Sequence, residues 1–359
     1  MQALRAEFPV LERLAYLNAG TNGPVPRRAV DAAGAALEEQ AIGGRGGGAF
    51  FERVVGAGGR LRARLAGLMG CEAAELALTG STTDGVNAVL AALDLREGDE
   101  ALTSDEEHPG LLAPLAAARE RRGVRVRVAP FGELAEAVGP RTRLVACSHV
   151  SWVTGRVVDA ARLAAGPARV LLDGAQGLGA VPVDVAELGC DFYAASGQKW
   201  LCGPNGIGYL FVRRELAGQL PSPWPSYMSL AAPERALELE LLPDARRFDT
   251  AAPAAQQLAW ALAALDVLEA APGLDAVQAR AAEGAERLAG ELAERGATVA
   301  PRGRSTLVSW EHPDSAALVE RLRERGVVVR NLPGTPYVRA SVGGWTSDEE
   351  LDRLLALAG

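Results

Sequence analysis

Segments with strand-like and helix-like patterns alternate along this chain from about residue 60 to residue 215. Short apolar runs, bounded by glycine and polar turns, are followed by longer stretches with helical periodicity. This alternation predicts repeated strand and helix units around a mostly parallel sheet, and therefore an α/β fold. Ligands of such sheets bind at the carboxyl ends of the strands, so polar residues there are candidates for a site. The strands are expected at 76–80, 143–150, 168–176, 190–197 and 206–212.

The length of 359 residues favours two unequal domains, because single hydrophobic cores stop growing at about 250–300 residues. We expect a large domain over residues 20–250 and a small α+β domain that combines residues 1–19 with 251–359. An apolar helical pattern at 253–272 is the expected connector. The proline-rich segment 219–234 is expected to form a loop that lies over the site.

Composition excludes several classes of protein. The net charge of −8 is spread without long runs of one sign, which argues against a nucleic-acid surface or a basic membrane anchor. There is neither a signal-peptide pattern nor an unbroken apolar run long enough to span a membrane, so a cytoplasmic location and a small-molecule partner are expected. The four cysteines are far apart, as is typical of free thiols. The Gly-rich run 43–48 has two interpretations, an anion cradle or a mobile or interface loop, and the loop is favoured.

Lys199 is the only lysine among 37 basic residues, and all the others are arginines. Arginine suffices wherever only a positive charge is needed. A retained lysine therefore indicates a primary amine that can lose its proton and attack a carbonyl. Lys199 follows the apolar run 190–197, where a loop can present the amine to a cleft. The alternative is that a surface lysine has been retained by chance.

Asp173 ends the buried run RVLLD, where an unpaired carboxylate would cost several kcal/mol, so it needs a cationic partner. The pyridinium nitrogen of pyridoxal 5'-phosphate (PLP) is such a partner, and its protonation makes the ring an electron sink. A loop cap or an arginine ion pair is the alternative. Gln176 lies one short step further along and can reach the phenolic oxygen of the same cofactor.

Ser81, Thr82 and Thr83 stand between an apolar run and a helical pattern. Hydroxyl groups and backbone N–H groups at a helix N-terminus form an anion site, which suits a phosphate. Ordinary capping of the helix is the equally weighted alternative. Ser196 and Gln198, on either side of the lysine loop, are further candidates for hydrogen bonds to the phosphate.

His108 lies in a polar loop and is one of three histidines. Its ring can stack on a pyridine ring, and a solvated loop histidine is the alternative. The spacing of the three histidines does not match a metal site, so no metal is expected.

Taken together, these residues resemble the class V aminotransferase family of fold type I PLP enzymes, nearest the branch of cysteine and cystine C–S lyases. The resemblance covers nearly the whole chain. It implies a mostly parallel seven-stranded sheet, a smaller C-terminal α+β domain and a homodimer with active sites at the subunit interface. The matching segments are YLNAGTNGPVPRRA, GSTTDGVN, EHPG, SHVSWVTG, the block from DGAQ to YLFV at 173–212, and RASVGGWTSDEEL.

The resemblance also implies roles for individual residues. Lys199 resembles the lysine that holds PLP as a Schiff base, and Asp173 the partner of its ring nitrogen. Gln176 resembles the contact to the phenolic oxygen, and His108 the stacking ring. Arg339 resembles the arginine that binds the substrate α-carboxylate. Thr82, Thr83, Ser196 and Gln198 match phosphate-binding positions, and Asn18 falls where an N-terminal segment approaches the substrate.

Two departures from the cysteine desulfurases of this family narrow the expected function. Those enzymes need a nucleophilic cysteine shortly before the carboxylate-binding arginine, whereas the segment 324–341 has none and all four cysteines precede residue 203. Trp152 stands where desulfurases commonly have Asn, and a bulky aromatic residue there resembles the C–S lyase branch.

We therefore expect PLP-dependent β-elimination from cysteine or a cysteine S-conjugate to give pyruvate, ammonia and a sulfur product, with Lys199 as the base that takes the Cα proton. Arg330 is the expected partner of a second, distal carboxylate, and a solvent-facing arginine is the alternative. An aminotransferase or epimerase on the same scaffold remains open, and a desulfurase or a non-catalytic relative is less favoured.

Overall fold

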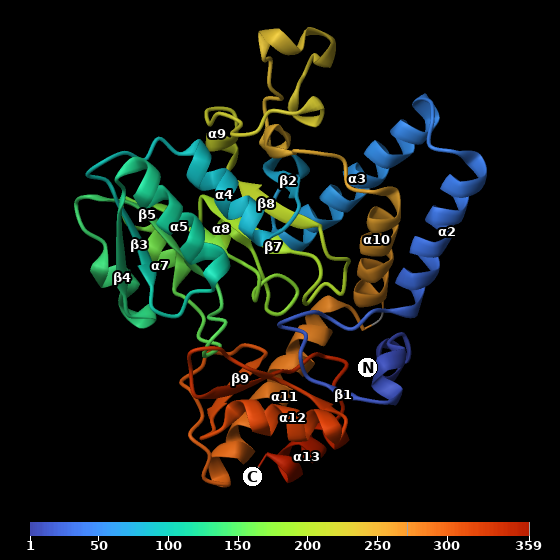
Figure 1. Ribbon diagram of the computed structural model, residues 1–359, viewed down its shortest axis with the longest axis vertical. Helices are drawn as coiled ribbons and strands as arrows, with labels where there is room; N and C mark the ends of the chain where they lie inside the picture. Colours follow the sequence, from blue (N-terminus) through green and yellow to red (C-terminus); the bar gives the residue numbers. More distant parts are fainter. Residues whose placement is uncertain (271, 359) are drawn as a thin grey trace.

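The computed structural model describes residues 1–270 and 272–358, and a seven-stranded sheet forms its centre (Figure 1). The strand order is β2-β8-β7-β6-β5-β3-β4. Only β8 runs antiparallel to its neighbours, so the predicted α/β fold with a mostly parallel seven-stranded sheet is confirmed. The strands are β2 (Leu76–Thr79), β3 (Glu100–Ser104), β4 (Arg125–Ala129), β5 (Thr142–Ser148), β6 (Arg169–Asp173), β7 (Phe192–Ser196) and β8 (Gly208–Val212).

The central strands are buried on both faces, which explains their nearly continuous apolar sequences. Successive side chains point to opposite faces, so Leu171 and Leu172 belong to two different hydrophobic clusters. One cluster packs under α4 and α5, and the other under α3, α7, α8 and α10. These helices are α3 (Gly48–Met69), α4 (Thr82–Ala92), α5 (Pro109–Arg122), α7 (Ala160–Ala164), α8 (Val185–Leu188) and α10 (Ala255–Glu269).

The two strands at one edge, β3 and β4, lie outside the strands expected from the sequence. β4 has the sequence RVRVA, and its two arginines interrupt the apolar pattern because the edge strand faces solvent. β3 begins with Glu100, a buried carboxylate that accepts hydrogen bonds from Arg127 (2.8 Å) and Thr142 (2.7 Å). Neither strand therefore has the long apolar run by which the others were predicted.

The C-terminal part of the chain forms a smaller layer below the large sheet (Figure 1). A three-stranded antiparallel sheet has the order β11-β12-β9, and the N-terminal strand β1 pairs in parallel with β10. The predicted domain limits, 20–250 and 1–19 with 251–359, stay a prediction. These strands are β1 (Ala15–Tyr16), β9 (Leu307–Glu311), β10 (Val327–Val328), β11 (Arg330–Asn331) and β12 (Tyr337–Ser341), and the helices are α11 (Leu274–Glu294), α12 (Ser315–Glu324) and α13 (Asp348–Leu357).

Two segments project from the body of the molecule (Figure 1). The helical hairpin of α2 (Arg27–Gly43) and α3 carries the Gly-rich run 43–48 at its tip, where a side chain added at Gly44 or Gly47 would meet nothing within 4 Å. The second is the segment after α9 (Arg214–Ala217), which includes the proline-rich residues 219–234. The remaining short helices are α1 (Gln2–Ala6) and α6 (Leu134–Ala137). Among the residues described, we find no helix with both the length and the apolar character required to cross a membrane.

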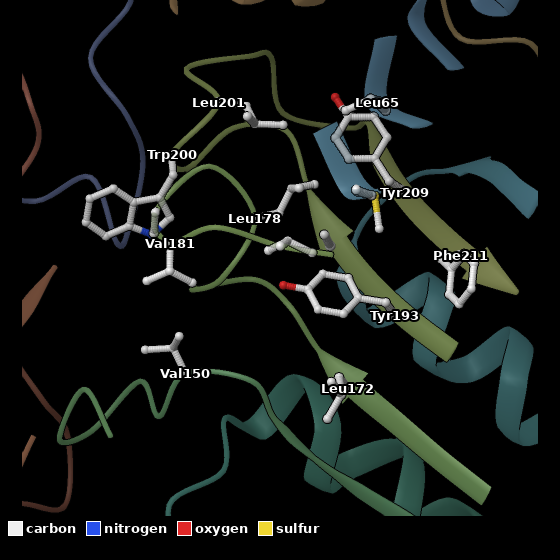
Figure 2. Close-up of a cluster of buried hydrophobic side chains, with 14 of the residues drawn as sticks. Leu65, Val150, Leu172, Leu178, Val181, Tyr193, Trp200, Leu201, Tyr209 and Phe211 are labelled. Atoms are coloured by element: carbon white, nitrogen blue, oxygen red, sulfur yellow. The ribbon is translucent and has the colours of Figure 1, made fainter. Parts of the chain in front are cut away.

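The core behind the carboxyl ends of β6 and β7 supports the loops that follow them (Figure 2). Leu172 and Tyr193 pair across these two strands and project to the same side, toward Val150 and Leu178. All four side chains are at most 3% exposed. The segments that follow β6 and β7 are thus packed on a close-fitting apolar base.

Leu172→Ala should lower the free energy of unfolding by about 2–5 kcal/mol, because it removes buried atoms and leaves a cavity under these loops. Val128 is 57% exposed on β4 and provides the control, since Val128→Ala should cost much less. Urea unfolding followed by circular dichroism measures both. Equal losses in the two variants would contradict the assignment of Leu172 to the core.

Candidate active site

A cavity of about 210 Å³ lies at the carboxyl ends of β6 and β7. Every candidate residue predicted from the sequence lines this cavity except Asn18. The structure adds Gly20, Thr21 and Ala175, which the sequence analysis missed. Gly20, Thr21 and Ala175 lie in segments that match the family pattern, but glycine and alanine have no reactive side chain and the Thr21 hydroxyl follows no apolar run that would have marked it as a candidate.

Lys199 and Asp173 both line the cavity, where Asp173 is buried and Lys199 is half-buried. Burial lowers the pKa of Lys199 to about 8, Asp173 opposes this shift, and the nearby Arg339 and Arg330 add to it. Burial raises the pKa of Asp173, while the charge of Lys199 and a hydrogen bond from the Ala175 N–H (2.9 Å) lower it. Within the described part of the chain, Asp173 forms no salt bridge. A cationic ring nitrogen would supply that missing partner.

The hydroxyl groups at one end of the cavity gather around the N-terminus of α4. The Ser81 hydroxyl caps the helix by accepting from the Asp84 N–H (3.1 Å), so the capping alternative is realised, although the hydroxyl proton remains available to a ligand. Thr82 donates its N–H to the Ser196 hydroxyl (3.0 Å) and joins β7 to this turn. Gly208 allows the close approach, because a Cβ there would collide with the backbone of Ser81. Hydroxyl groups and the positive end of a helix dipole together fit a phosphate group.

Gln176 is oriented by two hydrogen bonds that the sequence did not reveal. Its Oε1 accepts from the Trp200 indole N–H (3.0 Å), and its Nε2 donates to the Gly20 carbonyl (2.8 Å). One N–H of the amide is therefore left to donate to a ligand. Trp200, which is 2% exposed, thus determines which way the amide of Gln176 points.

His108 lines the cavity as the N-cap of α5, so it is not a solvated loop residue. Its Nδ1 accepts from the Gly110 N–H (3.0 Å), which leaves the proton of a neutral ring on Nε2. Burial, together with the charges of Lys199, Arg330 and Arg339, lowers the pKa of His108 to about 4. The ring is therefore neutral at physiological pH and suits stacking or donation from Nε2.

Arg339 is fully buried in β12, and its Nε and Nη2 have no hydrogen-bond partner among the residues described. Its Nη1 donates to the Trp152 carbonyl (2.7 Å). Burial and the charge of Arg330 lower the pKa of Arg339 to about 9. Buried donors without a partner cost free energy, and a carboxylate between Nε and Nη2 would satisfy both.

Arg330 lies directly opposite Arg339 in the β11–β12 pair. Like charges at opposed positions are destabilising, and neither arginine forms a salt bridge in the residues the structure covers. Arg330 donates weakly to the Thr21 hydroxyl (3.3 Å), and its guanidinium lies 5.8 Å from the ring centre of Trp152. This end of the cavity therefore carries positive charge that an anion would balance.

Two predicted features lie outside the cavity. Asn18 forms a bridge to Ser341, and its side-chain oxygen accepts from the Thr21 hydroxyl (2.8 Å), so it supports Thr21 behind the cavity lining. The proline-rich loop 219–234 was expected to lie over the site. It contributes no residue to the lining of this cavity. Trp224 of the loop instead lines a neighbouring pocket together with Thr79 and Asp84.

The fold and this constellation define a class of protein, the fold type I PLP-dependent enzymes. The chain belongs to the aminotransferase class-V family, whose sequence model matches residues 15–354. PLP is its cofactor, and the residues described above suit the charge of each part of that molecule.

Two curated relatives illustrate the range of the family. A cysteine desulfurase of Salmonella gallinarum is 34% identical over 62% of this chain, and the match spans only 60% of the length of that enzyme. Isopenicillin N epimerase of Streptomyces clavuligerus is 31% identical over 94% of this chain and 92% of its own length.

Among solved structures, a mutant of C-DES with glycine covalently linked to its PLP cofactor superimposes with a TM-score of 0.92. It is 30% identical, and the match covers 99% of this chain and 98% of that one. A complex of the cystine C–S lyase C-DES with its reaction product cysteine persulfide gives a TM-score of 0.91 at 30% identity, over 98% of this chain and 99% of that one. The cysteine desulfurase of Thermococcus onnurineus, at 22% identity, shares the fold with a TM-score of 0.87.

Gly23→Ala should weaken PLP binding about tenfold or more, because a Cβ at this position collides with the Lys199 carbonyl and displaces the lysine loop. Gly34→Ala is the control, since Gly34 lies in α2 with nothing within 4 Å of an added Cβ. Titration of the apo-protein with PLP, followed by visible absorbance, measures both affinities. Wild-type affinity in Gly23→Ala would show that the packing of Gly23 on Lys199 is unimportant.

Proposed function

We propose that the enzyme is a PLP-dependent C–S lyase that performs β-elimination on cysteine or a cysteine S-conjugate, such as cystine, a thioether or a sulfoxide. The products would be pyruvate, ammonia and a sulfur compound. The observation that carries this proposal is the composition of the cavity, which combines an amine with two guanidinium groups and contains no cysteine. The similarity to the cystine C–S lyase C-DES over nearly the whole chain supports it.

The positions of the cysteines argue against a desulfurase. Persulfide formation on the enzyme requires a thiol beside the substrate sulfur, yet none of the four cysteines lines the cavity. Cys202 is the one nearest to Lys199 in sequence, but it is buried and its pKa is raised well above its usual value by burial. A thiol in that state is a poor nucleophile.

Each side chain of the cavity has a role in the proposed reaction. Bound PLP supplies an electron sink for the charge that develops at the substrate Cα. Arg339 Nε and Nη2 bind the substrate α-carboxylate, and Asp173 provides the negative charge opposite the ring nitrogen. Lys199 Nζ takes the proton from Cα as general base, and its lowered pKa of about 8 keeps a useful fraction deprotonated near neutral pH. As the Cβ–S bond breaks, the sulfur leaves with the bonding electron pair.

The remaining candidates would hold the cofactor. Gln176 would donate its free N–H to the phenolic oxygen, and His108 would lie against the ring. Ser81, Thr82, Thr83, Ser196 and Gln198 would hold the phosphate.

We also propose that the enzyme is a homodimer. The two projecting segments carry apolar side chains that are exposed in the single chain, among them Ile42 at 82%, Tyr227 at 64% and Leu237 at 104%. Exposed apolar surface of this kind marks an interface with another chain, and most soluble oligomers are symmetric assemblies of one chain. A partner subunit would cover these residues.

An epimerase is the second candidate, because isopenicillin N epimerase matches 94% of the chain at 31% identity. It would use the same cofactor contacts and return the Cα proton to the other face. An aminotransferase would also share them. Neither reaction breaks a bond to sulfur, so detection of the sulfur product separates both from the lyase.

Incubation with cystine should yield pyruvate, and Arg339→Lys should lower kcat/KM about 100-fold, because an ammonium group cannot replace the guanidinium fork. Lys199→Ala should abolish turnover. Pyruvate measured with lactate dehydrogenase reports the reaction. Amino transfer to a keto acid, or racemisation without pyruvate, would overturn the lyase proposal.

Arg330→Gln should lower kcat/KM for cystine about tenfold and leave S-methylcysteine nearly unaffected, because only cystine carries a distal carboxylate for Arg330. S-methylcysteine therefore serves as the control for cystine within the same variant. Equal losses of kcat/KM for both substrates would show that Arg330 contributes only to the overall positive charge of the cavity and does not bind a distal carboxylate.

A further inference from the structure

Glu107 is a buried carboxyl group that neither the family resemblance nor the proposed reaction explains. It directly precedes His108 and is 5% exposed. Its two oxygens accept from the Ser148 N–H (2.9 and 3.0 Å) and the Ser148 hydroxyl (2.6 Å). The Ser104 hydroxyl also donates to it (2.5 Å). Because Ser104 ends β3 and Ser148 ends β5, this single side chain joins the carboxyl ends of both strands.

The neighbouring Glu106 makes a second link to the same segment. Its carboxylate accepts from the Thr154 hydroxyl (2.5 Å) and forms an ion pair with Arg156 (3.5 Å). The segment Ser148–Thr154 is thus held at both of its ends by consecutive residues of the loop that carries His108. Trp152 lies within this segment.

Trp152 is in contact with the substrate end of the cavity on several sides. Its ring lies edge-on to the ring of His108, with 4.9 Å between centroids, and its carbonyl accepts from Arg339 (2.7 Å). His108 directly follows Glu107 in the chain and caps α5. A shift at Glu107 would therefore move both the stacking ring and the indole that packs against it.

The surroundings of Glu107 do not suit a residue kept for stability alone. It forms no salt bridge in the part of the chain that the structure describes. Burial, and to a smaller extent Asp173, raise its pKa to about 7 against the opposing effect of the hydrogen bonds from Ser104 and Ser148, so the group costs free energy to bury. Four hydrogen-bond contacts to two strand ends offset that cost and fix the geometry of the loop.

We infer that Glu107 is a positioning residue that fixes the wall of the active site formed by His108 and Trp152. It touches neither cofactor nor substrate and acts through these two rings. The inference depends on PLP occupying the cavity but not on the reaction that follows. It can therefore be tested without any substrate.

The test compares Glu107→Ala and Glu107→Gln with a control on the same strand. Glu100 lies at the opposite end of β3 and is also a 5% exposed carboxylate with hydrogen bonds, so Glu100→Ala removes a matched group far from the cavity. Two quantities are measured on the PLP-loaded proteins, the visible circular dichroism per bound cofactor and the dissociation constant of PLP. The thermal midpoint is recorded as a measure of folding.

Glu107→Ala should reduce the visible circular dichroism of bound PLP about twofold or more and weaken PLP binding about tenfold, because the asymmetric setting of the cofactor depends on the adjacent rings. Glu107→Gln should restore most of both signals, since its amide can accept from Ser148 and donate to Ser104. Glu100→Ala should lower the thermal midpoint without changing the circular dichroism. Wild-type circular dichroism of bound PLP in Glu107→Ala would overturn the inference. An equal change in the circular dichroism of Glu100→Ala would also overturn it.

Thr154→Val provides a second route if Glu107→Ala fails to fold. It removes the hydroxyl that binds Glu106 and frees the other end of the segment, while the volume of the side chain is conserved. The circular dichroism of bound PLP should then fall without a large change in the thermal midpoint. An unchanged signal in this variant would contradict the role assigned to the two links.

Discussion

The hydrogen bond from Arg339 to the Trp152 carbonyl is the contact on which the arrangement of the site depends. It joins the C-terminal three-stranded sheet to the segment that follows β5 of the large sheet. The Ser305 hydroxyl donates to the Gly155 carbonyl (2.6 Å) and the Ser309 hydroxyl to the Val153 carbonyl (2.5 Å), so the same segment is held at three points. The substrate end of the cavity exists only because these two layers meet along this segment.

The charges of the cavity are not balanced by the chain itself. Lys199, Arg330 and Arg339 face one another across a small volume, and Asp173 is the only carboxylate among the residues that line it. Such an excess of positive charge is unfavourable in a buried site unless anions complete it. The phosphate of PLP and the carboxylates of an amino acid are anions of the required kind, so the same charges that destabilise the empty site favour the loaded one.

The comparisons establish the family and the cofactor, but they include enzymes with different reactions. The chain is similar both to a cysteine desulfurase and to isopenicillin N epimerase, two enzymes whose names denote different reactions. What separates these activities is the set of groups near the substrate side chain. Trp152, Arg330 and Thr21 line the cavity here and there is no thiol among the lining residues, and on this the lyase proposal rests.

The sequence by itself determined five of the seven strands of the large sheet and the polar residues at their ends, because apolar periodicity is a local signal and a single lysine among arginines is visible without a fold. Tertiary structure decided which groups meet. The contact between Arg339 and Trp152 joins residues 187 positions apart, and the link between Trp200 and Gln176 depends on how two loops pack. The sequence does not distinguish Glu107 from other acidic loop residues, because its contacts are with the ends of β3 and β5, which lie beside it only in the folded chain. Hydrogen bonds depend on distance and direction in space, and a one-dimensional pattern does not contain that information.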